Sequence, residues 1–343
     1  MKTSVDRARK SVVDAIISNE FPVGTLLPPV SELATRTRCS EATMQNALLN
    51  LAWEGVVSRV RKRGTIVERI PKSSRVALVL SFDLHENILL REQVYSRMDL
   101  AGFDIDVMYR TTDFPSDLAK LKRLREGLEP VEQLVMLSPD AKLLAEATQL
   151  FPKVIAWMFD CPLTDHHAVR VDYQEAARAV AEYLLDLGHT KIGVCAGDFL
   201  GDYESFAAET YRTFRHLVEI RGGQCVPHYF ARQSVEAFGE EHFGKDITAY
   251  WALIDSEAVK AVMLCQKKGL RVPQDISILG RNDTPWCTAL TPNLTSLSIN
   301  PEGVAEAIVN ILEGKLPKSR GKFCTLTITP KLVIRDSTGL SAR

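Results

Sequence analysis

The chain has 343 residues, 45% of them hydrophobic and 25% charged, which is enough apolar content and length for more than one globular domain. Its seven cysteines form no CxxC pair and no Cys/His cluster at metal spacing, which argues against a zinc site and for reduced thiols in a cytosol. No signal-peptide core is present, and no apolar run approaches the about 18 residues that span a bilayer, so we expect a cytoplasmic protein without a membrane partner.

The charge is distributed unevenly along the chain. Its net charge is −1, but residues 1–70 hold 11 Lys/Arg against 7 Asp/Glu, and residues 71–343 hold 31 against 36. A small basic module attached to a larger acidic one favours a nucleic-acid-binding domain on a body that does not bind nucleic acid.

The first 60 residues predict three short helices. Apolar positions recur at helical spacing over residues 4–18, and turn and extended segments follow at 21–24 and 26–29. Ser31 is expected to cap a second helix over residues 32–37. Ser40 is expected to cap a third, which Gly55 ends.

The third helix runs into a hairpin whose tip carries adjacent cations. Strands are predicted at residues 56–60 and 65–67, around Arg61, Lys62, Arg63 and Gly64. A charge run is often only a solvated surface. The alternative is a wing that presents cations to a phosphate backbone beside a recognition helix. The preceding helices favour the wing, and therefore a winged helix-turn-helix.

This segment resembles the DNA-binding domain of GntR-type bacterial transcription factors. The matching pieces are Phe21-Pro22-x-Gly24, Leu27-Pro28, Glu32-Leu33-Ala34, Ser40-x-x-Thr43, Ala47-Leu48-x-x-Leu51, Glu54-Gly55 and Arg63-Gly64-Thr65. The resemblance implies a DNA-binding surface on the recognition helix and wing. Its candidate residues are Ser31, Ser40, Glu41, Thr43, Gln45, Asn46, Arg59, Arg61, Lys62, Arg63, Gly64 and Thr65.

Three positions depart from the family pattern. Ser31, Glu41 and Gln45 stand where the family usually has Arg, so the usual arginine contacts with guanine are missing. Gln45 and Asn46 fit adenine edges, and Glu41 fits cytosine N4 or merely caps the helix. An ordinary surface role remains open for each of these residues. The operator should therefore differ from that of typical relatives.

Beyond a polar linker at residues 71–74, strands and helices alternate. Strands are predicted at 76–80, 104–109, 133–137, 154–157, 169–171, 191–195, 261–264 and 276–280, and helices at 88–100, 118–126, 140–150, 174–187, 205–220, 256–267 and 301–312. The predicted strand at 261–264 overlaps the predicted helix at 256–267. The alternation predicts an α/β fold of doubly wound layers, and its length predicts two lobes.

This body resembles the LacI/GalR-type effector domain, which is related to periplasmic sugar-binding proteins. The resemblance lies in Val171-Asp172-Tyr173, in Leu184-x-x-Leu187-Gly188-His189-x-Lys191-Ile192-Gly193, in the run from Lys268 to Gly280, and in Leu290-Thr291-Pro292-x-Leu294-Thr295-Ser296-Leu297. Together with the head it resembles arabinose-repressor-type regulators. It implies a DNA-binding domain at 1–70 and an effector domain at 75–335, with lobe 1 at about 75–168 and 300–322 and lobe 2 at about 169–297 and 323–335.

An effector is expected at the carboxyl ends of the strands, where open α/β sheets bind ligands. The candidates are Phe82, Asp83, Trp157, Asp160, Thr210, Phe230, Asp255, Asn282, Asp283 and Trp286. Short polar side chains suit sugar hydroxyls and aromatic rings suit sugar faces, although core packing is the alternative for each ring. Asp255 either points to the ligand or caps the helix that follows it.

Two departures affect the identity of the effector. The resemblance implies an Arg near position 210 and an Asp two residues after Gly280, but Thr210 and Asn282 stand there. The family's usual sugar or purine therefore cannot be carried over. A neutral, larger ligand and a site that has lost its ligand both remain open.

These features predict a cytoplasmic transcriptional regulator, a repressor by resemblance, with double-stranded operator DNA, a carbohydrate-like effector and a second copy in a homodimer as partners. No GxSxG, Walker A, GxGxxG or HExxH motif occurs, so no catalytic residue, metal or cofactor is expected. The adjacent His166 and His167 make a poor metal-ligand pair and are expected in a loop. The alternative function is a constitutive DNA-binding protein whose effector site is altered or lost.

Overall fold

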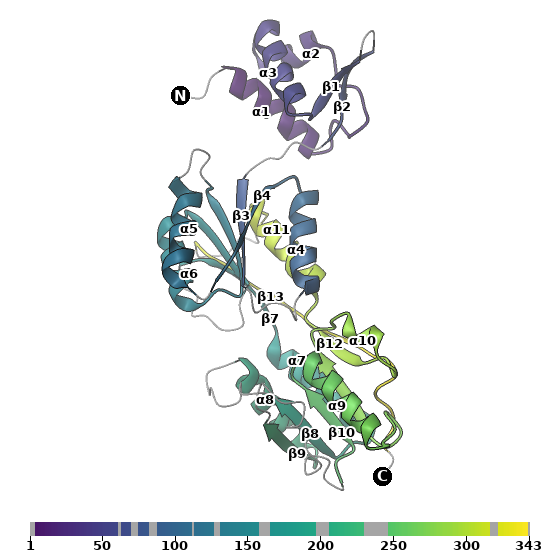
Figure 1. The fold of residues 1–343 in the computed structure, drawn as a ribbon. Coiled ribbons are helices and arrows are strands. Elements are labelled where there is room, and N and C mark those ends of the chain that lie inside the picture. The colour runs from purple at the N-terminus through teal and green to yellow at the C-terminus, as the bar shows by residue number, and fades with distance from the viewer. Residues whose placement is uncertain are drawn as a thin grey trace. The chain divides into compact units, whose positions relative to one another are not determined.

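The computed structural model describes residues 4–60, 63–69, 75–81, 88–111, 113–126, 131–157, 165–196, 206–229, 246–315 and 322–341 (Figure 1). The chain divides into two compact units. One comprises Met1–Val76 with Met98–Asp106, and the other comprises Ala77–Arg97 with Val107–Arg343. Among the described helices, none is both long and apolar enough to cross a membrane.

The N-terminal head is a three-helix bundle with a hairpin (Figure 1). Its elements are α1 (Ser4–Ile17), α2 (Val30–Thr37), α3 (Glu41–Trp53), β1 (Val57–Val60) and β2 (Gly64–Val67). One apolar cluster joins them all, because each helix buries one stripe and the hairpin buries Val57 and Val67. The antiparallel strands place Val57 opposite Val67 and Val60 opposite Gly64. The winged helix-turn-helix prediction is therefore confirmed.

The helix caps agree with the sequence at one site and differ at another. Ser40 caps α3, since its hydroxyl accepts from the Thr43 N–H at 3.1 Å. Gly55 follows the helix at φ +70, a conformation that favours glycine. The expected cap at Ser31 is wrong, because α2 begins two residues earlier than expected, at Val30, and its N-cap Pro29 provides no side-chain cap. Proline has no side-chain acceptor, and the Glu32 and Leu33 N–H groups instead donate to the Pro29 carbonyl.

The first parallel sheet has the strand order β13-β7-β6-β5-β3-β4. Its strands are β3 (Arg75–Leu80), β4 (Asp104–Tyr109), β5 (Gln133–Leu137), β6 (Lys153–Trp157), β7 (His167–Val171) and β13 (Thr325–Ile328). The helices of this lobe are α4 (Ile88–Leu100), α5 (Phe114–Glu126), α6 (Ala141–Leu150) and α11 (Pro301–Leu312). The inner strands are buried almost end to end, as expected of a parallel sheet covered on both faces.

The second sheet has the order β14-β12-β11-β10-β8-β9. Its strands are β8 (Lys191–Ala196), β9 (Gln224–Tyr229), β10 (Ala249–Ala252), β11 (Ser277–Arg281), β12 (Thr295–Ser298) and β14 (Lys331–Val333). The helices are α7 (Tyr173–Asp186), α8 (Phe206–Ile220), α9 (Asp255–Lys267) and the short α10 (Trp286–Ala289). All described pairings in this sheet are parallel except that of β12 with β14.

Several predicted boundaries are corrected by the strand pairing. Strands β7 and β13 pair with each other in the first sheet, although the predicted lobe limits assigned residues 169–171 and 323–335 to the second. Residues 261–264 are helical and belong to α9, not to a strand. His167 is the first residue of β7, so the loop expectation fails for it. Strand β9 was missed because Pro227 interrupts its pattern, and a sheet edge tolerates that proline.

Candidate DNA-binding surface and effector site

Helix α3 presents a polar face away from the head's core. Met44, Ala47 and Leu48 are buried. The intervening and flanking positions carry the exposed side chains Glu41, Ala42, Gln45, Asn46 and Leu49. This separation follows from the 3.6-residue period of the helix. The exposed face therefore offers one carboxylate and two amides, groups that read base edges by hydrogen bonding.

The hairpin that follows this helix in the sequence carries exposed cationic side chains. Arg59 is exposed on β1 opposite Thr65, and Arg63 is exposed just before β2. Arg61 and Lys62 lie outside the described residues. Gly64 has φ +116, and an added Cβ would press on Leu26 at 3.3 Å. The segment at Leu26 pairs with Ile66, so the link between α1 and α2 braces the hairpin.

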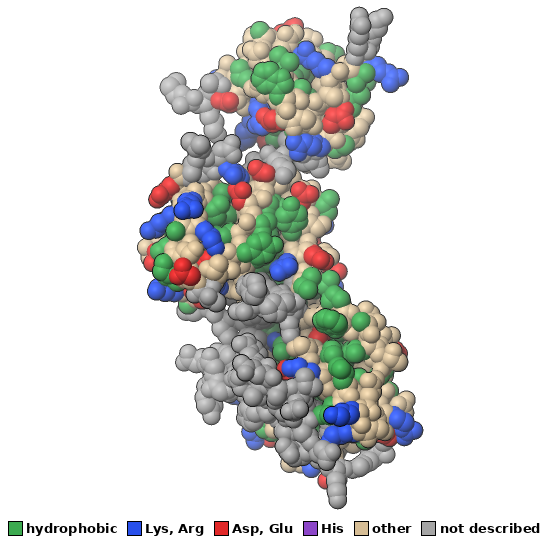
Figure 2. All heavy atoms as spheres, viewed as in Figure 1, with side chains coloured by type: hydrophobic (Ala, Val, Ile, Leu, Met, Phe, Trp, Pro, Cys, Tyr) green, Lys and Arg blue, Asp and Glu red, His purple; other side chains and the backbone are tan. Residues whose placement is uncertain are grey.

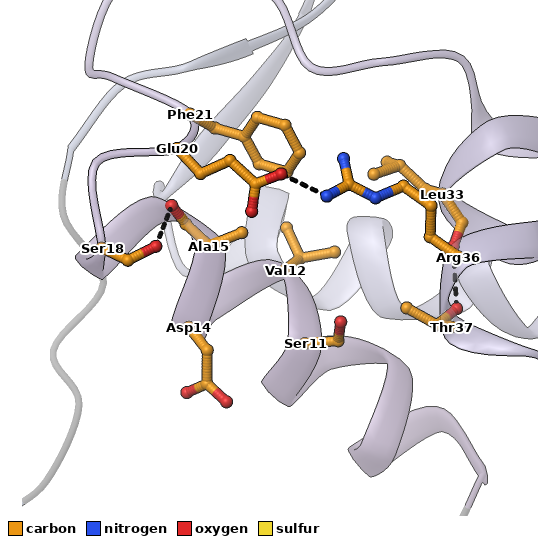
Figure 3. Close-up of a pocket in the computed structure, with 10 residues that line it drawn as sticks. All are labelled: Ser11, Val12, Asp14, Ala15, Ser18, Glu20, Phe21, Leu33, Arg36 and Thr37. Atoms are coloured by element: carbon orange, nitrogen blue, oxygen red, sulfur yellow. Dashed lines mark hydrogen bonds and ion pairs between the residues drawn. The ribbon is translucent and has the colours of Figure 1, made fainter.

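A groove of about 330 Å³ lies between α1, the loop after it and α2 (Figure 3). Its floor is apolar, with Val12, Phe21 and Leu33. Arg36 closes one side by pairing with Glu20 and by lying 5.5 Å from the centre of the Phe21 ring. Side chains of both charge signs lie on the face of the head that Figure 2 shows.

Some of the candidate effector residues lie within the described part of the chain and others lie outside it. Phe82, Asp83, Asp160 and Phe230 lie outside the described residues. Trp157, Thr210 and Asp255 are fully buried, Asn282 is buried, Asp283 is half-buried and Trp286 is 63% exposed. Trp157 ends a strand of the first sheet, and the other described candidates belong to the lobe built on the second sheet.

Asp255 has a role that neither sequence alternative foresaw. Its carboxylate accepts hydrogen bonds from the Thr284 N–H at 2.7 Å, the Ser296 hydroxyl at 2.7 Å and the Cys287 thiol at 3.3 Å. It does not cap α9, which starts at Asp255 after Ile254 without a side-chain cap. Burial raises the pKa of this carboxyl, and the Thr284 and Ser296 bonds only partly offset that effect. The carboxylate thus ties α9 to the segment that follows β11.

The other described candidates also have internal contacts. The Asp283 carboxylate pairs with Arg335 at 2.7 Å, so a ligand would have to share it. Asn282 donates its N–H to the Leu297 carbonyl at 2.9 Å and holds φ at +101, a strained angle of the kind that often occurs at binding sites. The exposed Trp286 opens α10, whereas Trp157 lies within the first sheet's core at the end of β6.

Two buried residues at the second sheet, Arg281 and Trp251, were not among the sequence candidates. Arg281 ends β11 and is 3% exposed, with its guanidinium carbon 5.9 Å from the centre of the Tyr173 ring. Trp251 of β10 is fully buried against Phe214 of α8, with ring centres 4.8 Å apart. The only sequence signal was the position of Arg281, directly after Gly280 at a strand end. Its burial could not be read from that position.

Two family descriptions match separate parts of the chain. Residues 5–67 match the bacterial regulatory proteins of the gntR family. Residues 181–338 match the periplasmic binding protein-like domain. The first match covers all three head helices and the hairpin, and the second covers most of the lobe built on the second sheet.

Relatives of this chain are transcriptional regulators. The ribose operon repressor of Haemophilus influenzae is 24% identical over 233 residues, 63% of this chain and 68% of the relative. The repressor PurR of Pasteurella multocida is 27% identical over 206 residues, 57% of this chain and 59% of the relative, which is less than two thirds of its length. A LacI family regulator from Arthrobacter sp. FB24, solved with lactose, covers 78% of this chain and 100% of its own at a TM-score of 0.63 and 18% identity. That structural likeness shows the fold.

Proposed function

We propose that this chain, which joins a GntR-type helix-turn-helix head to a LacI-type periplasmic-binding-like body, is a sequence-specific DNA-binding regulator that represses transcription. The observation that carries the proposal is the head: a capped helix with an exposed polar face, followed by an antiparallel hairpin with exposed cations. Such a regulator acts on chromosomal DNA, which places it in the cytoplasm.

The DNA-binding surface comprises α3 and the hairpin. Gln45 and Asn46 read bases, and Arg59 and Arg63, with Arg61 and Lys62, bind phosphates. Ser40 and Thr43 hold the first turn of α3, and Gly64 and Thr65 shape the turn of the hairpin. Glu41 either accepts from a cytosine amine or repels a wrong base at the same position.

A small molecule controls DNA binding from the body. The Arthrobacter regulator was solved with lactose, and a carbohydrate-like effector suits the polar and aromatic groups at the strand ends of this body. Binding shifts the balance between two arrangements of the body, and the head responds through the connecting segment.

We further propose a homodimer, because one small winged helix reads one half-site and twofold symmetry doubles it. The edge strand β4 supports this proposal, since its Val107 and Tyr109 are 40% and 56% exposed. Tyr95 on α4 is 46% exposed in the same lobe, whose apolar side chains are visible in Figure 2. An exposed apolar edge normally has a partner.

Selection of bound duplexes from a random pool, with the full chain, tests the function directly. Enrichment of a two-part site with related halves is expected, and sedimentation should give a dimer on that site. Duplexes recovered without any sequence preference at moderate salt would reduce the head to a nonspecific DNA binder. A site that is bound equally with and without every sugar tested would favour the constitutive alternative.

A further inference from the structure

The second lobe keeps a permanent positive charge at the end of a central strand. Arg281 is the last residue of β11 and is 3% exposed. Its guanidinium lies over the ring of Tyr173, the first residue of α7. An arginine stays protonated when buried, and burying a charge is costly. Carboxyl strand ends are where open α/β sheets bind ligands, so this charge stands where a ligand is expected.

A second buried donor lies on the same face of the sheet. An added Cβ at Gly280 would meet Asp255 and Ala258, so Gly280 faces α9. Side chains alternate along a strand, so Leu279 and Arg281 face the other way, toward α7. Trp251 sits opposite Leu279 in the neighbouring strand and packs on Phe214 of α8, so it shares that face. Strand geometry puts the Cα atoms of Trp251 and Arg281 roughly 8 Å apart.

Among the described residues, none accepts a hydrogen bond from the indole of Trp251. The residue is fully buried, yet its Nε1–H has no partner in the described structure. Buried indole N–H groups usually find one, because an unsatisfied buried donor costs free energy. A bound group that only accepts hydrogen bonds would give this N–H its acceptor. It would also match the fork of the guanidinium, whose N–H donors suit carboxylate and phosphate oxygens.

We propose that Arg281 and the Trp251 Nε1–H receive an anionic group of the effector, a carboxylate or a phosphate carried by a sugar. The proposal rests on the effector-controlled function given above and names the ligand class for it. Neutral sugar hydroxyls donate as well as accept, and they gain less from a buried cation. The positions 210 and 282 carry the uncharged Thr210 and Asn282, so the charge that selects the ligand comes instead from Arg281.

Matched ligand series test the ligand class on the full chain. Calorimetry compares glucose with glucuronate and glucose 6-phosphate, and galactose with galacturonate and galactose 6-phosphate. At least one acid or phosphate should bind at least about tenfold more tightly than its neutral parent, since charge-assisted hydrogen bonds are the strong ones. Comparing the affinities of the sugar acids with those of the sugar phosphates identifies which anion the site binds. The proposal is wrong if no anionic member binds, or if a neutral parent binds as well as both of its anions.

Variants then locate the anion. Arg281→Gln should weaken the bound anion about tenfold to hundredfold and leave any neutral sugar unchanged. Arg281→Lys keeps the charge but not the forked donor geometry, so its affinity for the anion should lie between those of wild type and Arg281→Gln. Trp251→Phe keeps an aromatic ring and removes the N–H. It should weaken binding of the anion several-fold, which tests the site even if the Arg281 variants fail to fold.

Arg170→Gln, at an exposed arginine of β7, is the matched control and should bind the anion like wild type. Unchanged anion affinity in Trp251→Phe and in a folded Arg281 variant would overturn the site.

Operator binding separates this inference from the function on which it rests. Each protein is also tested on the selected duplex. A neutral sugar that releases the operator while every anion is inert would sink the ligand class and leave the regulator intact. Failure of the wild-type chain to prefer any duplex would sink the regulator, whatever ligand binds.

Discussion

At the scale of single residues, Asp255 shows how a candidate ligand can instead hold the fold together. Its carboxylate accepts three hydrogen bonds from Thr284, Ser296 and Cys287. Gly280 is needed beside it, because an added Cβ would overlap the Asp255 carboxylate. The glycine after Ile278 and Leu279 is therefore explained by packing against α9 and requires no contact with an effector.

Substitution of Asp255 should affect stability first. Asp255→Ala leaves the buried Thr284 N–H without its acceptor and should lower the free energy of unfolding by about 1–3 kcal/mol. Asp255→Asn should cost less, since its amide oxygen can accept from Thr284 while its NH₂ donates to the Ser296 hydroxyl. Urea unfolding of both variants measures the difference. Equal stability of Asp255→Ala and wild type would show that these bonds contribute nothing.

His189 predicts how stability depends on pH. Its Nε2–H donates to the Gly339 carbonyl at 3.0 Å, and Nδ1 lies 2.9 Å from the Thr248 hydroxyl, as suits a neutral ring. Burial lowers the pKa of His189 in the folded chain, with the Gly339 bond opposing it. The unfolded ring takes up a proton near pH 6.5, before the folded ring does. Its contribution is therefore present above that pH and is lost as the pH falls toward the lowered folded pKa.

Unfolding free energies measured from pH 7.5 down to 5 in wild type and His189→Gln check this sign. The wild-type curve should fall more steeply below about pH 6.5 than the variant's curve. Burial also lowers the pKa of His167, so some slope should survive in the variant. Parallel curves for the two proteins would remove His189 as a source of acid sensitivity.

At the scale of elements, β8 and β10 pair so that the side chain of Tyr250 lies over Gly193 and leaves no room for a Cβ there. A Cβ at Gly193 would overlap the ring of Tyr250, which is fully buried in the adjacent strand. Gly193→Ala should destabilise the chain by about 1–3 kcal/mol through overpacking. Tyr250→Leu replaces the ring with a smaller side chain. The double variant should therefore lose less unfolding free energy than the sum of the losses in the two single variants. Additive losses in urea unfolding would show that the ring and the alanine do not clash.

Helix α3 and its wing should contribute differently to DNA binding. Alanine at Arg61, Lys62 and Arg63 should weaken binding to every duplex and flatten its dependence on salt, because phosphate contacts release counterions. Alanine at Gln45 and Asn46 should instead relax the preference at one or two base pairs, by about 1–3 kcal/mol for a good bidentate contact. Binding titrations on the selected duplex and on a scrambled one, across several salt concentrations, distinguish the two effects. Identical losses on both duplexes from the Gln45 and Asn46 changes would make them phosphate contacts.

At the scale of the whole molecule, effector and operator should be coupled. If the effector changes the affinity for operator by some factor, operator must change the affinity for effector by the same factor. Calorimetric titration of effector into the free chain and into its operator complex measures how operator changes the affinity for effector. Operator titration with and without effector measures how effector changes the affinity for operator. The sign also decides whether the effector releases or promotes binding. An effector that binds tightly but equally to both forms would leave the body without control over the head.

Sequence alone determined the winged helix-turn-helix, the cap at Ser40 and most helices and strands of the body, because periodicity, caps and glycine ends are local properties that neighbouring residues impose. Sheet membership was not local: β7 and β13 belong to one sheet because strands 157 residues apart in sequence pair side by side, as Ala168 does with Thr325. Only tertiary structure decided that Asp255 is buried among three donors, and that Arg281 and Trp251 share a face of the second sheet. Burial and pairing depend on which distant elements meet, and no short stretch of sequence specifies that.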